Sequence, residues 1–256
     1  MKVLVQIKAV LVTIFLLIFV LMPACLIAAP FGLQRRLKIV CPVWQFFSKM
    51  LLRHACQAKF DIQQDHRSEP FRGVPAFGLY VANHQSYIDI PTIIAIYQMP
   101  PIMKKEVLYI PLFGWLGWIS GALPVSRSKV DSRKKVLDQA KNRILNERIG
   151  IQVYPEGTRS KEAAPKPYEA IKRTLMVFAY NEGIPVIPTS VYGTRGVLSP
   201  QGFVVPNRHI GVIVHKEIDP KDFKGSDEFC RAVWAKVTQG YQEMQQQLGP
   251  LNENLS

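Results

Sequence analysis

The sequence predicts an α/β fold: a single domain with a central mixed sheet, preceded by an N-terminal membrane helix and an amphipathic helix. Two observations support this prediction. From residue 70 onward, short apolar runs alternate with segments of helical periodicity, the pattern of strands and helices packed in layers. Before that point the chain opens with a long uncharged run, whose length is typical of a membrane helix.

Length and charge limit the classes of protein that fit. The chain has 256 residues, of which 48% are hydrophobic, so it suits one domain with an appendage and excludes a disordered tail. Lysine and arginine number 32 against 19 acids, which gives a net charge of +13. No acid precedes Asp61, whereas the segment before it contains the bases Lys2, Lys8, Arg35, Arg36, Lys38, Lys49, Arg53 and Lys59. Because these bases flank an apolar run, they favour anionic membrane lipid as the partner and no nucleic acid.

The cysteines and the missing motifs exclude several common chemistries. The four cysteines (Cys25, Cys41, Cys56 and Cys230) are sparse and form no CxxC pair, so a disulfide-stapled module is excluded and no metal is expected. GxSxG, GxGxxG, the Walker loop and HExxH are also absent from the sequence. Their absence removes the commonest serine-hydrolase, dinucleotide-binding and zinc-protease interpretations.

The first apolar run is interpreted as a retained membrane anchor. Residues 9–34 carry no charge, and about 20 apolar residues are enough to cross a bilayer as a helix. Pro23 is expected to kink or end this helix, which leaves both a tilted span and an element embedded in one leaflet open. A cleaved signal peptide is the alternative, but the run is long for one and no clean cleavage site closes it. The bases that follow place the remainder of the chain on the cytoplasmic face of the (inner) membrane.

A second helix is predicted over Pro42–Phe60. Its apolar residues are expected to touch the membrane, while Lys49 and Arg53 lie on a polar side at a spacing of four. A core helix of the globular domain is the alternative. With this helix, residues 1–60 form the predicted membrane-anchoring segment.

The α/β domain is predicted over residues 61–244, followed by a polar, frayed tail at 245–256. Its strands are expected at 77–82, 151–154, 185–191 and 210–214, and its helices at 130–146, 171–180 and 229–244. Polar clusters directly follow two of these strands. They are the natural place to look for chemistry, because loops at strand ends carry binding and catalytic groups.

The first cluster contains a histidine followed by an acid. His84 comes directly after the 77–82 strand, and Asp89 lies five residues further on. A carboxylate beside an imidazole fixes its tautomer and stabilises the imidazolium that forms when it accepts a proton. Five residues on one regular helix would separate the two side chains, so His84 must lie in the turn and Asp89 near the helix start. A surface histidine with a helix-capping aspartate is the alternative.

The second cluster suits an anion. Glu156, Gly157, Thr158 and Arg159 follow the strand at 151–154; the glycine permits close backbone approach and the arginine offers a fork of donors to phosphate. A turn in which Glu156 and Arg159 pair with each other is the alternative. Two further bases, Lys105 and Arg127, flank an aromatic-rich stretch and are candidates to close on the same anion.

Taken together, these stretches resemble a known family. In order, NHQSYID, PLFGWLGWISGALPVSR, YPEGTRS and IPVIPTSV are similar to the glycerolipid acyltransferases, and most similar to the bacterial 1-acylglycerol-3-phosphate acyltransferases. The resemblance covers a motif core at residues 77–194. It implies a single glycerolipid-acyltransferase-type α/β domain with an N-terminal membrane-docking helical segment.

The resemblance also implies roles for individual residues. His84 would be the general base of an HxxxxD motif, with Asp89 orienting it. Glu156, Gly157, Thr158 and Arg159 would form the substrate-binding site for the acceptor's glycerol phosphate, and Lys105 and Arg127 would lie near it. The stretch after this block departs from the family's Phe-Lys-x-Gly pattern, because Lys172 keeps the lysine but Thr174 replaces the glycine. Tyr154 stands where phenylalanine is frequent.

The function implied is acyl transfer in phospholipid synthesis. A fatty acyl chain would pass from acyl-CoA or acyl-carrier protein to the free sn-2 hydroxyl of 1-acyl-sn-glycerol 3-phosphate, a lysophospholipid, forming phosphatidic acid. No cofactor is required beyond the acyl donor as co-substrate. The alternatives are transfer to another lysolipid acceptor such as a lyso-ornithine lipid, hydrolysis of a lipid, and a non-catalytic membrane lipid-binding protein.

Overall fold

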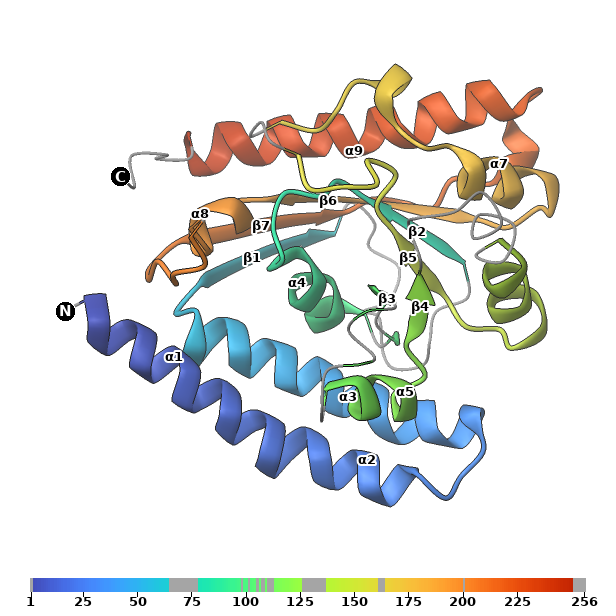
Figure 1. Ribbon diagram of the computed structural model, residues 1–256. Helices are drawn as coiled ribbons and strands as arrows, with labels where there is room; N and C mark the ends of the chain where they lie inside the picture. The colour runs from blue at the N-terminus through green and yellow to red at the C-terminus, as the bar shows by residue number, and fades with distance from the viewer. Residues whose placement is uncertain are drawn as a thin grey trace.

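A five-stranded mixed sheet forms the centre of the molecule (Figure 1). The computed structural model describes residues 2–64, 78–97, 99–100, 102–104, 106, 109, 113–125, 137–160, 164–199 and 201–250. The strands are β1 (Lys59–Gln64), β2 (Leu79–Ala82), β5 (Ile151–Val153), β6 (Val186–Tyr192) and β7 (His209–Val214), in the spatial order β1-β7-β6-β2-β5. Only the β6–β7 pair is antiparallel, so the predicted mixed α/β sheet is confirmed.

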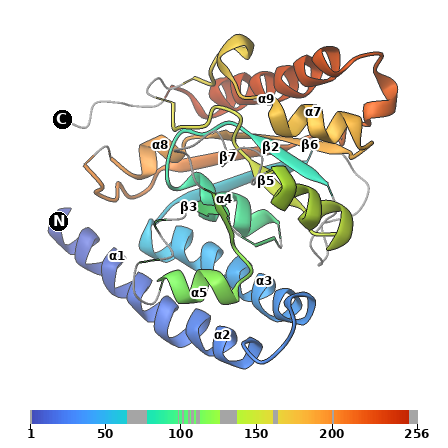
Figure 2. The same ribbon diagram turned by 45° about the vertical axis from the view of Figure 1, so that its right-hand side comes forward.

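Helices cover both faces of this sheet. The amphipathic helices α7 (Thr174–Asn181) and α9 (Ser226–Leu248) pack on one face, and α4 (Asp89–Ile96) lies on the other, together with the N-terminal helices (Figures 1 and 2). Strand alternation explains this layering. Leu79 and Val81 join the core under α9, whereas Tyr80 and Ala82 join the core on the α4 side.

The chain begins with an antiparallel helical hairpin. Its first arm runs without interruption through α1 (Lys2–Leu16), a π-helical turn η1 (Leu17–Leu21) and α2 (Met22–Ala28). Pro23 therefore does not end the helix as expected. The π turn lies immediately before it, where a proline disrupts the regular hydrogen-bond ladder. By length and composition alone, Lys2–Ala28 is long and apolar enough to cross a membrane.

The second arm differs from its prediction. Helix α3 spans Leu33–Met50 and continues through a π turn, η2 (Leu51–Ala55), so it starts nine residues before the predicted Pro42. Pro42 lies inside the helix, and Lys59–Phe60 already belong to β1. The prediction was wrong at both ends because apolar spacing carries the helix past proline, while β1 gains its strand pairing only from the distant β7.

The remaining elements are short and connect these layers. They are β3 (Ile102–Lys104), β4 (Leu123–Val125), α5 (Phe113–Ile119), a helical stretch at 137–141 that continues into η4 (Asn142–Asn146), η5 (Tyr168–Ala170), α8 (Thr194–Val197) and η6 (Pro220–Asp222). The predicted strands and the helices at 171–180 and 229–244 are confirmed to within a few residues. Helix α9 extends into the predicted frayed tail as far as Leu248, and residues 251–256 lie outside the described part of the chain.

Candidate active site

The two polar clusters meet at one edge of the sheet. Strands β2 and β5 are parallel neighbours, with Leu79 opposite Ile151, so the loops that follow them leave the sheet side by side. Two backbone contacts join the loops: His84 N–H donates to Glu156 Oε1 at 2.9 Å, and Ser160 N–H donates to the His84 carbonyl at 2.8 Å. The site is therefore built from two segments about 70 residues apart in sequence, as their placement after predicted strands suggested.

His84 and Asp89 form a buried pair. The Nδ1 atom of His84 lies 2.7 Å from Oδ2 of Asp89, and the two residues are 6% and 0% exposed. His84 lies in the turn after β2, while Asp89 is the first residue of α4. The geometry required by the five-residue spacing is thus present, and the surface-histidine alternative does not apply.

Three further donors hold the Asp89 carboxylate. Backbone N–H groups of Gln85 and Ser86 donate to Oδ2 at 2.6 and 2.9 Å, and the Thr194 hydroxyl donates to Oδ1. These hydrogen bonds fix the position of the carboxylate, which faces the His84 ring. Since Nδ1–H of His84 then donates to Asp89, the lone pair of the ring lies on Nε2, which is the atom left to act as a base.

Two residues that sequence reasoning did not assign fix the histidine from other directions. The Tyr154 ring stacks on the His84 ring, with centroids 4.3 Å apart and planes 24° apart. The Asn83 side chain both donates to and accepts from the backbone of Val191 on β6, each at 2.8 Å. These contacts connect the turn that contains His84 to β6 and to the residue that follows β5. Asn83 and Thr194 were missed because their partners are more than a hundred residues away.

Glu156 does not pair with Arg159. It is buried, and its Oε1 accepts the His84 N–H, while no hydrogen-bond partner reaches Oε2 within the described residues. Burial raises the pKa of Glu156 from its ordinary 4.5 to about 7, and the His84 N–H and Lys166 oppose part of this shift. The position of Glu156 is structural support for the histidine turn.

Lysines lie on both sides of the Glu156–Thr158 turn. Gly157 has φ +70, and a Cβ there would lie 2.9 Å from the Cε and Nζ atoms of Lys172, so only glycine lets this lysine lie against the backbone. Lys166 Nζ donates to the Glu156 carbonyl at 3.2 Å and to the Thr158 hydroxyl at 3.1 Å. Lys166 carried no signal in the sequence reasoning.

Arg159 is exposed at the mouth of the site. Its guanidinium lies over the Tyr87 ring, 3.8 Å from the centroid, and none of the described ion pairs joins it to Glu156. Stacking holds the planar group while leaving its N–H donors at the rim. Lys105 and Arg127, the other two predicted anion ligands, lie outside the described residues.

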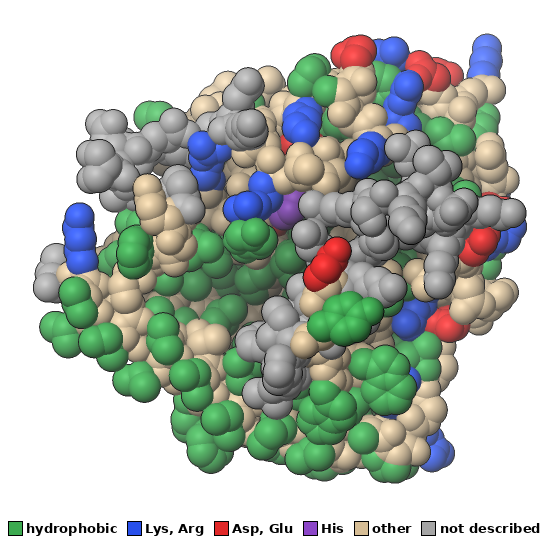
Figure 3. All heavy atoms as spheres, viewed as in Figure 1, with side chains coloured by type: hydrophobic (Ala, Val, Ile, Leu, Met, Phe, Trp, Pro, Cys, Tyr) green, Lys and Arg blue, Asp and Glu red, His purple; other side chains and the backbone are tan. Residues whose placement is uncertain are grey.

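An apolar hollow lies below this basic rim. Figure 3 shows hydrophobic side chains lining a recess between the N-terminal helices and the sheet layer, with lysine and arginine side chains gathered above it. The arrangement places charge and apolar surface side by side, which suits an amphiphilic ligand. Among the described residues, no group of three or more His, Cys, Asp or Glu side chains is arranged to hold a metal ion.

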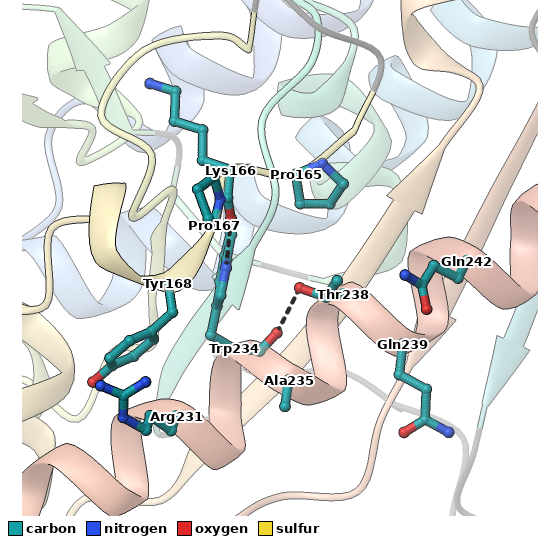
Figure 4. Close-up of a pocket in the computed structure, with 10 residues that line it drawn as sticks. All are labelled: Pro165, Lys166, Pro167, Tyr168, Arg231, Trp234, Ala235, Thr238, Gln239 and Gln242. Atoms are coloured by element: carbon teal, nitrogen blue, oxygen red, sulfur yellow. Dashed lines mark hydrogen bonds between the residues drawn. The ribbon is translucent and has the colours of Figure 1, made fainter.

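A separate groove of about 560 Å³ lies on the other face, between α9 and the segment before η5. In Figure 4 the Lys166 side chain points away from this groove, while its carbonyl accepts the Trp234 indole N–H at 2.9 Å. Trp234 thus anchors the backbone of a lysine whose amine reaches the active-site turn. The groove is lined by Pro165, Lys166, Pro167, Tyr168, Arg231, Trp234, Ala235, Thr238, Gln239 and Gln242.

The site thus combines a buried histidine hydrogen-bonded to a carboxylate with a basic turn and an apolar recess. The sequence model of the Acyltransferase family matches residues 65–192, half of the chain, and the chain belongs to this family. The match includes both loops of the site.

Individual relatives agree with this assignment. The chain is 32% identical over 147 residues to the chloroplastic 1-acyl-sn-glycerol-3-phosphate acyltransferase BAT2 of Brassica napus, covering 55% of this chain and 40% of that protein. It is 30% identical over 165 residues to the 1-acyl-sn-glycerol-3-phosphate acyltransferase of Escherichia coli, covering 60% of this chain and 64% of that protein. The matches therefore span less than two thirds of these relatives' lengths.

The fold has a solved counterpart. The crystal structure of the 1-acyl-sn-glycerophosphate acyltransferase PlsC from Thermotoga maritima superposes with a TM-score of 0.77, at 23% identity, over 95% of this chain and 96% of that one. The shared fold extends over the N-terminal helices as well as the sheet, whereas the family model matches only residues 65–192.

Proposed function

We propose that this protein transfers a fatty acyl group from a thioester, acyl-CoA or acyl-carrier protein, to the free sn-2 hydroxyl of 1-acyl-sn-glycerol 3-phosphate. The product is phosphatidic acid. The observation that carries the proposal is the His84–Asp89 pair beside the Glu156–Arg159 turn, to which it is joined by the 2.9 Å hydrogen bond from the His84 N–H to Glu156 Oε1. The named activity of the E. coli and B. napus relatives supports the choice of acceptor.

His84 acts as the general base. Its Nε2 takes the proton of the acceptor hydroxyl as that oxygen attacks the thioester carbonyl carbon. When the tetrahedral intermediate collapses, the C–S bond breaks, the electron pair leaves on sulfur, and His84 returns the proton to the thiolate. Asp89 stabilises the transient imidazolium without taking the proton, since four donors already hold its carboxylate.

The basic rim positions the acceptor. Arg159, stacked on Tyr87, offers paired N–H donors to the phosphate, and Lys166 and Lys172 add charge from either side of the turn. Lys105 and Arg127 belong to the same proposed phosphate site. With the phosphate fixed at the rim, the acyl chain of the acceptor extends toward the apolar recess, and the glycerol hydroxyl comes within reach of His84.

The N-terminal hairpin attaches the protein to the membrane that holds the acceptor. Its first arm exposes large apolar side chains along α1, η1 and α2, including Leu4, Leu11, Phe15, Phe19 and Ile27. Lysines and arginines flank this surface, which favours anionic lipid and the cytoplasmic face of the (inner) membrane.

The test compares wild type with His84→Ala in membranes, using labelled lysophosphatidate with acyl-CoA or acyl-carrier protein in parallel. We expect diacyl product with wild type and a loss of about 10²–10⁴ in rate in the variant, the usual contribution of a positioned base. Lysophosphatidate binding without product from either donor would contradict the proposal and indicate another acceptor or a lipid-binding protein. Release of free fatty acid in its place would indicate hydrolysis.

A further inference from the structure

A glutamine side chain in α1 is hydrogen-bonded to the backbone of a distant turn. Gln6 Nε2 donates to the Val204 carbonyl at 2.8 Å, and Val204 N–H donates to Gln6 Oε1, also at 2.8 Å. The side-chain amide of Gln6 thus binds both the N–H and the carbonyl of Val204, a residue 198 positions away in sequence. A paired contact of this kind fixes direction as well as distance, so the turn is held against the start of α1.

Hydrogen bonds within this turn also hold its shape. Leu198 and Val204 form an antiparallel bridge, Ser199 N–H donates to the Phe203 carbonyl at 2.8 Å, and Phe203 N–H donates to the Ser199 hydroxyl at 3.1 Å. Gly202 has φ +87, a conformation that glycine supplies without strain. These bonds fix the backbone of Phe203 opposite Ser199, and 58% of the Phe203 surface is exposed.

The surface around this turn matches an anionic bilayer. Phe203 lies next to the start of α1, where Val3, Leu4 and Ile7 are at least half exposed. Residues 183–216 contain no acid but include Arg195, Arg208 and Lys216, and α1 begins with Lys2 and Lys8. Exposed apolar side chains among bases without acids are what interfacial binding to anionic lipid requires.

We propose that the turn described by residues 198–199 and 201–205 is a second membrane-contacting element, in which Phe203 enters the lipid interface and Gln6 sets its orientation. The inference rests on the membrane attachment proposed above. It extends that attachment from the N-terminal hairpin to a loop of the α/β domain. The turn follows α8, so it lies a few residues after Thr194, whose hydroxyl donates to Asp89 of the proposed catalytic pair.

The chain allows a clean test by site-specific labelling. All four native cysteines are buried, so Phe203→Cys introduces a selectively reactive thiol for an environment-sensitive nitrobenzoxadiazole dye. The full chain is placed in vesicles of phosphatidylglycerol and phosphatidylcholine, with and without brominated phospholipid. Matched labels at Leu11→Cys on the exposed face of α1 and Ala235→Cys on the far side of α9 give the lipid and water references.

We expect blue-shifted emission and at least twofold quenching by brominated lipid at positions 203 and 11, and neither at 235. Gln6→Ala should reduce quenching at 203 while leaving position 11 unchanged. Gln34→Ala, which removes another side-chain bond from a helix to a distant carbonyl, should change neither.

Quenching at 11 without quenching at 203 would overturn the proposal and place the turn in water. A blue shift at 203 without quenching would also overturn it, because the turn would then be covered by protein such as a second copy. Absence of quenching at both positions would refute this proposal and the proposed membrane attachment together. Acyl transfer, measured on the same samples, reports separately on the proposed reaction.

Discussion

At the scale of single residues, the active site is defined by which atoms are already occupied. Asp89 lies against Nδ1 of His84, which leaves Nε2 for the proposed role as general base, and the Tyr154 ring stacks on the imidazole. The same reasoning applies to Arg159, whose stacking on Tyr87 leaves its donors directed at the rim.

Arg159→Lys should raise the KM for the acceptor about tenfold or more while changing the KM for the acyl donor little. Lysine keeps the charge but loses the paired donors and the planar stacking on Tyr87, and a hydrogen bond to a charged group contributes about 1.5–3 kcal/mol. Initial rates with each substrate varied in turn give the two constants. Arg173→Lys is the matched control, since Arg173 pairs with Asp227. An unchanged acceptor KM would remove Arg159 from the phosphate site.

Glu156→Gln should change how stability depends on pH. The folded pKa of Glu156 is about 7 against an ordinary 4.5, so the folded state binds this proton more tightly than the unfolded state. Protonated Glu156 therefore stabilises the folded state, and this contribution to the free energy of unfolding is complete below the unfolded pKa and is lost as pH rises through about 7. Glutamine keeps the acceptor for the His84 N–H and has no such loss.

Thermal unfolding in detergent from pH 5 to pH 8 is the measurement for this variant. The melting temperature of Glu156→Gln, relative to wild type, should rise with pH across the window. A difference that stays constant at every pH would show that Glu156 does not titrate in this way.

At the scale of elements, helix α9 packs unusually closely on strand β6 of the sheet. Ser190 Oγ on β6 lies 2.8 Å from the Val237 carbonyl of α9 and 2.8 Å from Nε2 of His215. Gly240 makes this approach possible, because a Cβ at that position would lie 2.5 Å from both Ser190 Oγ and His215 Nε2. Val191, the next residue on β6, is hydrogen-bonded to Asn83, so the packing of α9 is connected to the residue before His84.

Gly240→Ala should lower the free energy of unfolding by about 1–3 kcal/mol. Alanine gains about 1 kcal/mol in helix propensity, but overpacking a close contact and disturbing a buried hydrogen bond cost more. Denaturant unfolding measures the difference. Gln239→Ala, at the neighbouring exposed position, is expected to stay within about 0.5 kcal/mol of wild type. A more stable Gly240→Ala protein would mean that the helix can move outward at little cost.

At the scale of the whole molecule, the N-terminal hairpin belongs to the fold as well as to the proposed membrane surface. Leu16, Leu21 and Cys25 of its first arm are buried in one cluster with Phe47 of α3 and Leu116 of α5. The second arm packs on α4 at the other side, which resolves the alternative for α3 in favour of a core helix. The division predicted at residue 60 therefore cuts through packed structure and through β1.

Deleting Lys2–Ala28 should destabilise the protein rather than release a soluble enzyme. The deletion uncovers the apolar faces of α3 and α5, and an exposed patch of this kind promotes aggregation. Size-exclusion chromatography and thermal unfolding in detergent compare the deletion with the full chain. A monodisperse protein in the absence of detergent, with an unchanged melting temperature, would contradict this expectation.

The sequence by itself determined the layer pattern and the chemical groups of the site. Apolar runs at 77–82, 151–154 and 185–191 predict buried strands because burial on both faces leaves little room for polar residues. The polar clusters after two of these strands contained His84, Asp89 and the Glu156–Arg159 turn. Such signals are local, so they can be read without knowing the partners of a segment.

Only the tertiary structure decided the rest, because the remaining determinants are contacts between distant segments. Strand β1 forms by pairing with β7. The Asp89 carboxylate accepts a hydrogen bond from the hydroxyl of Thr194, which is 105 residues away. Lys166 reaches the active-site turn only because Trp234 of α9 holds its backbone. Hydrogen bonds and packing of this kind depend on three-dimensional proximity, which no spacing along the chain encodes.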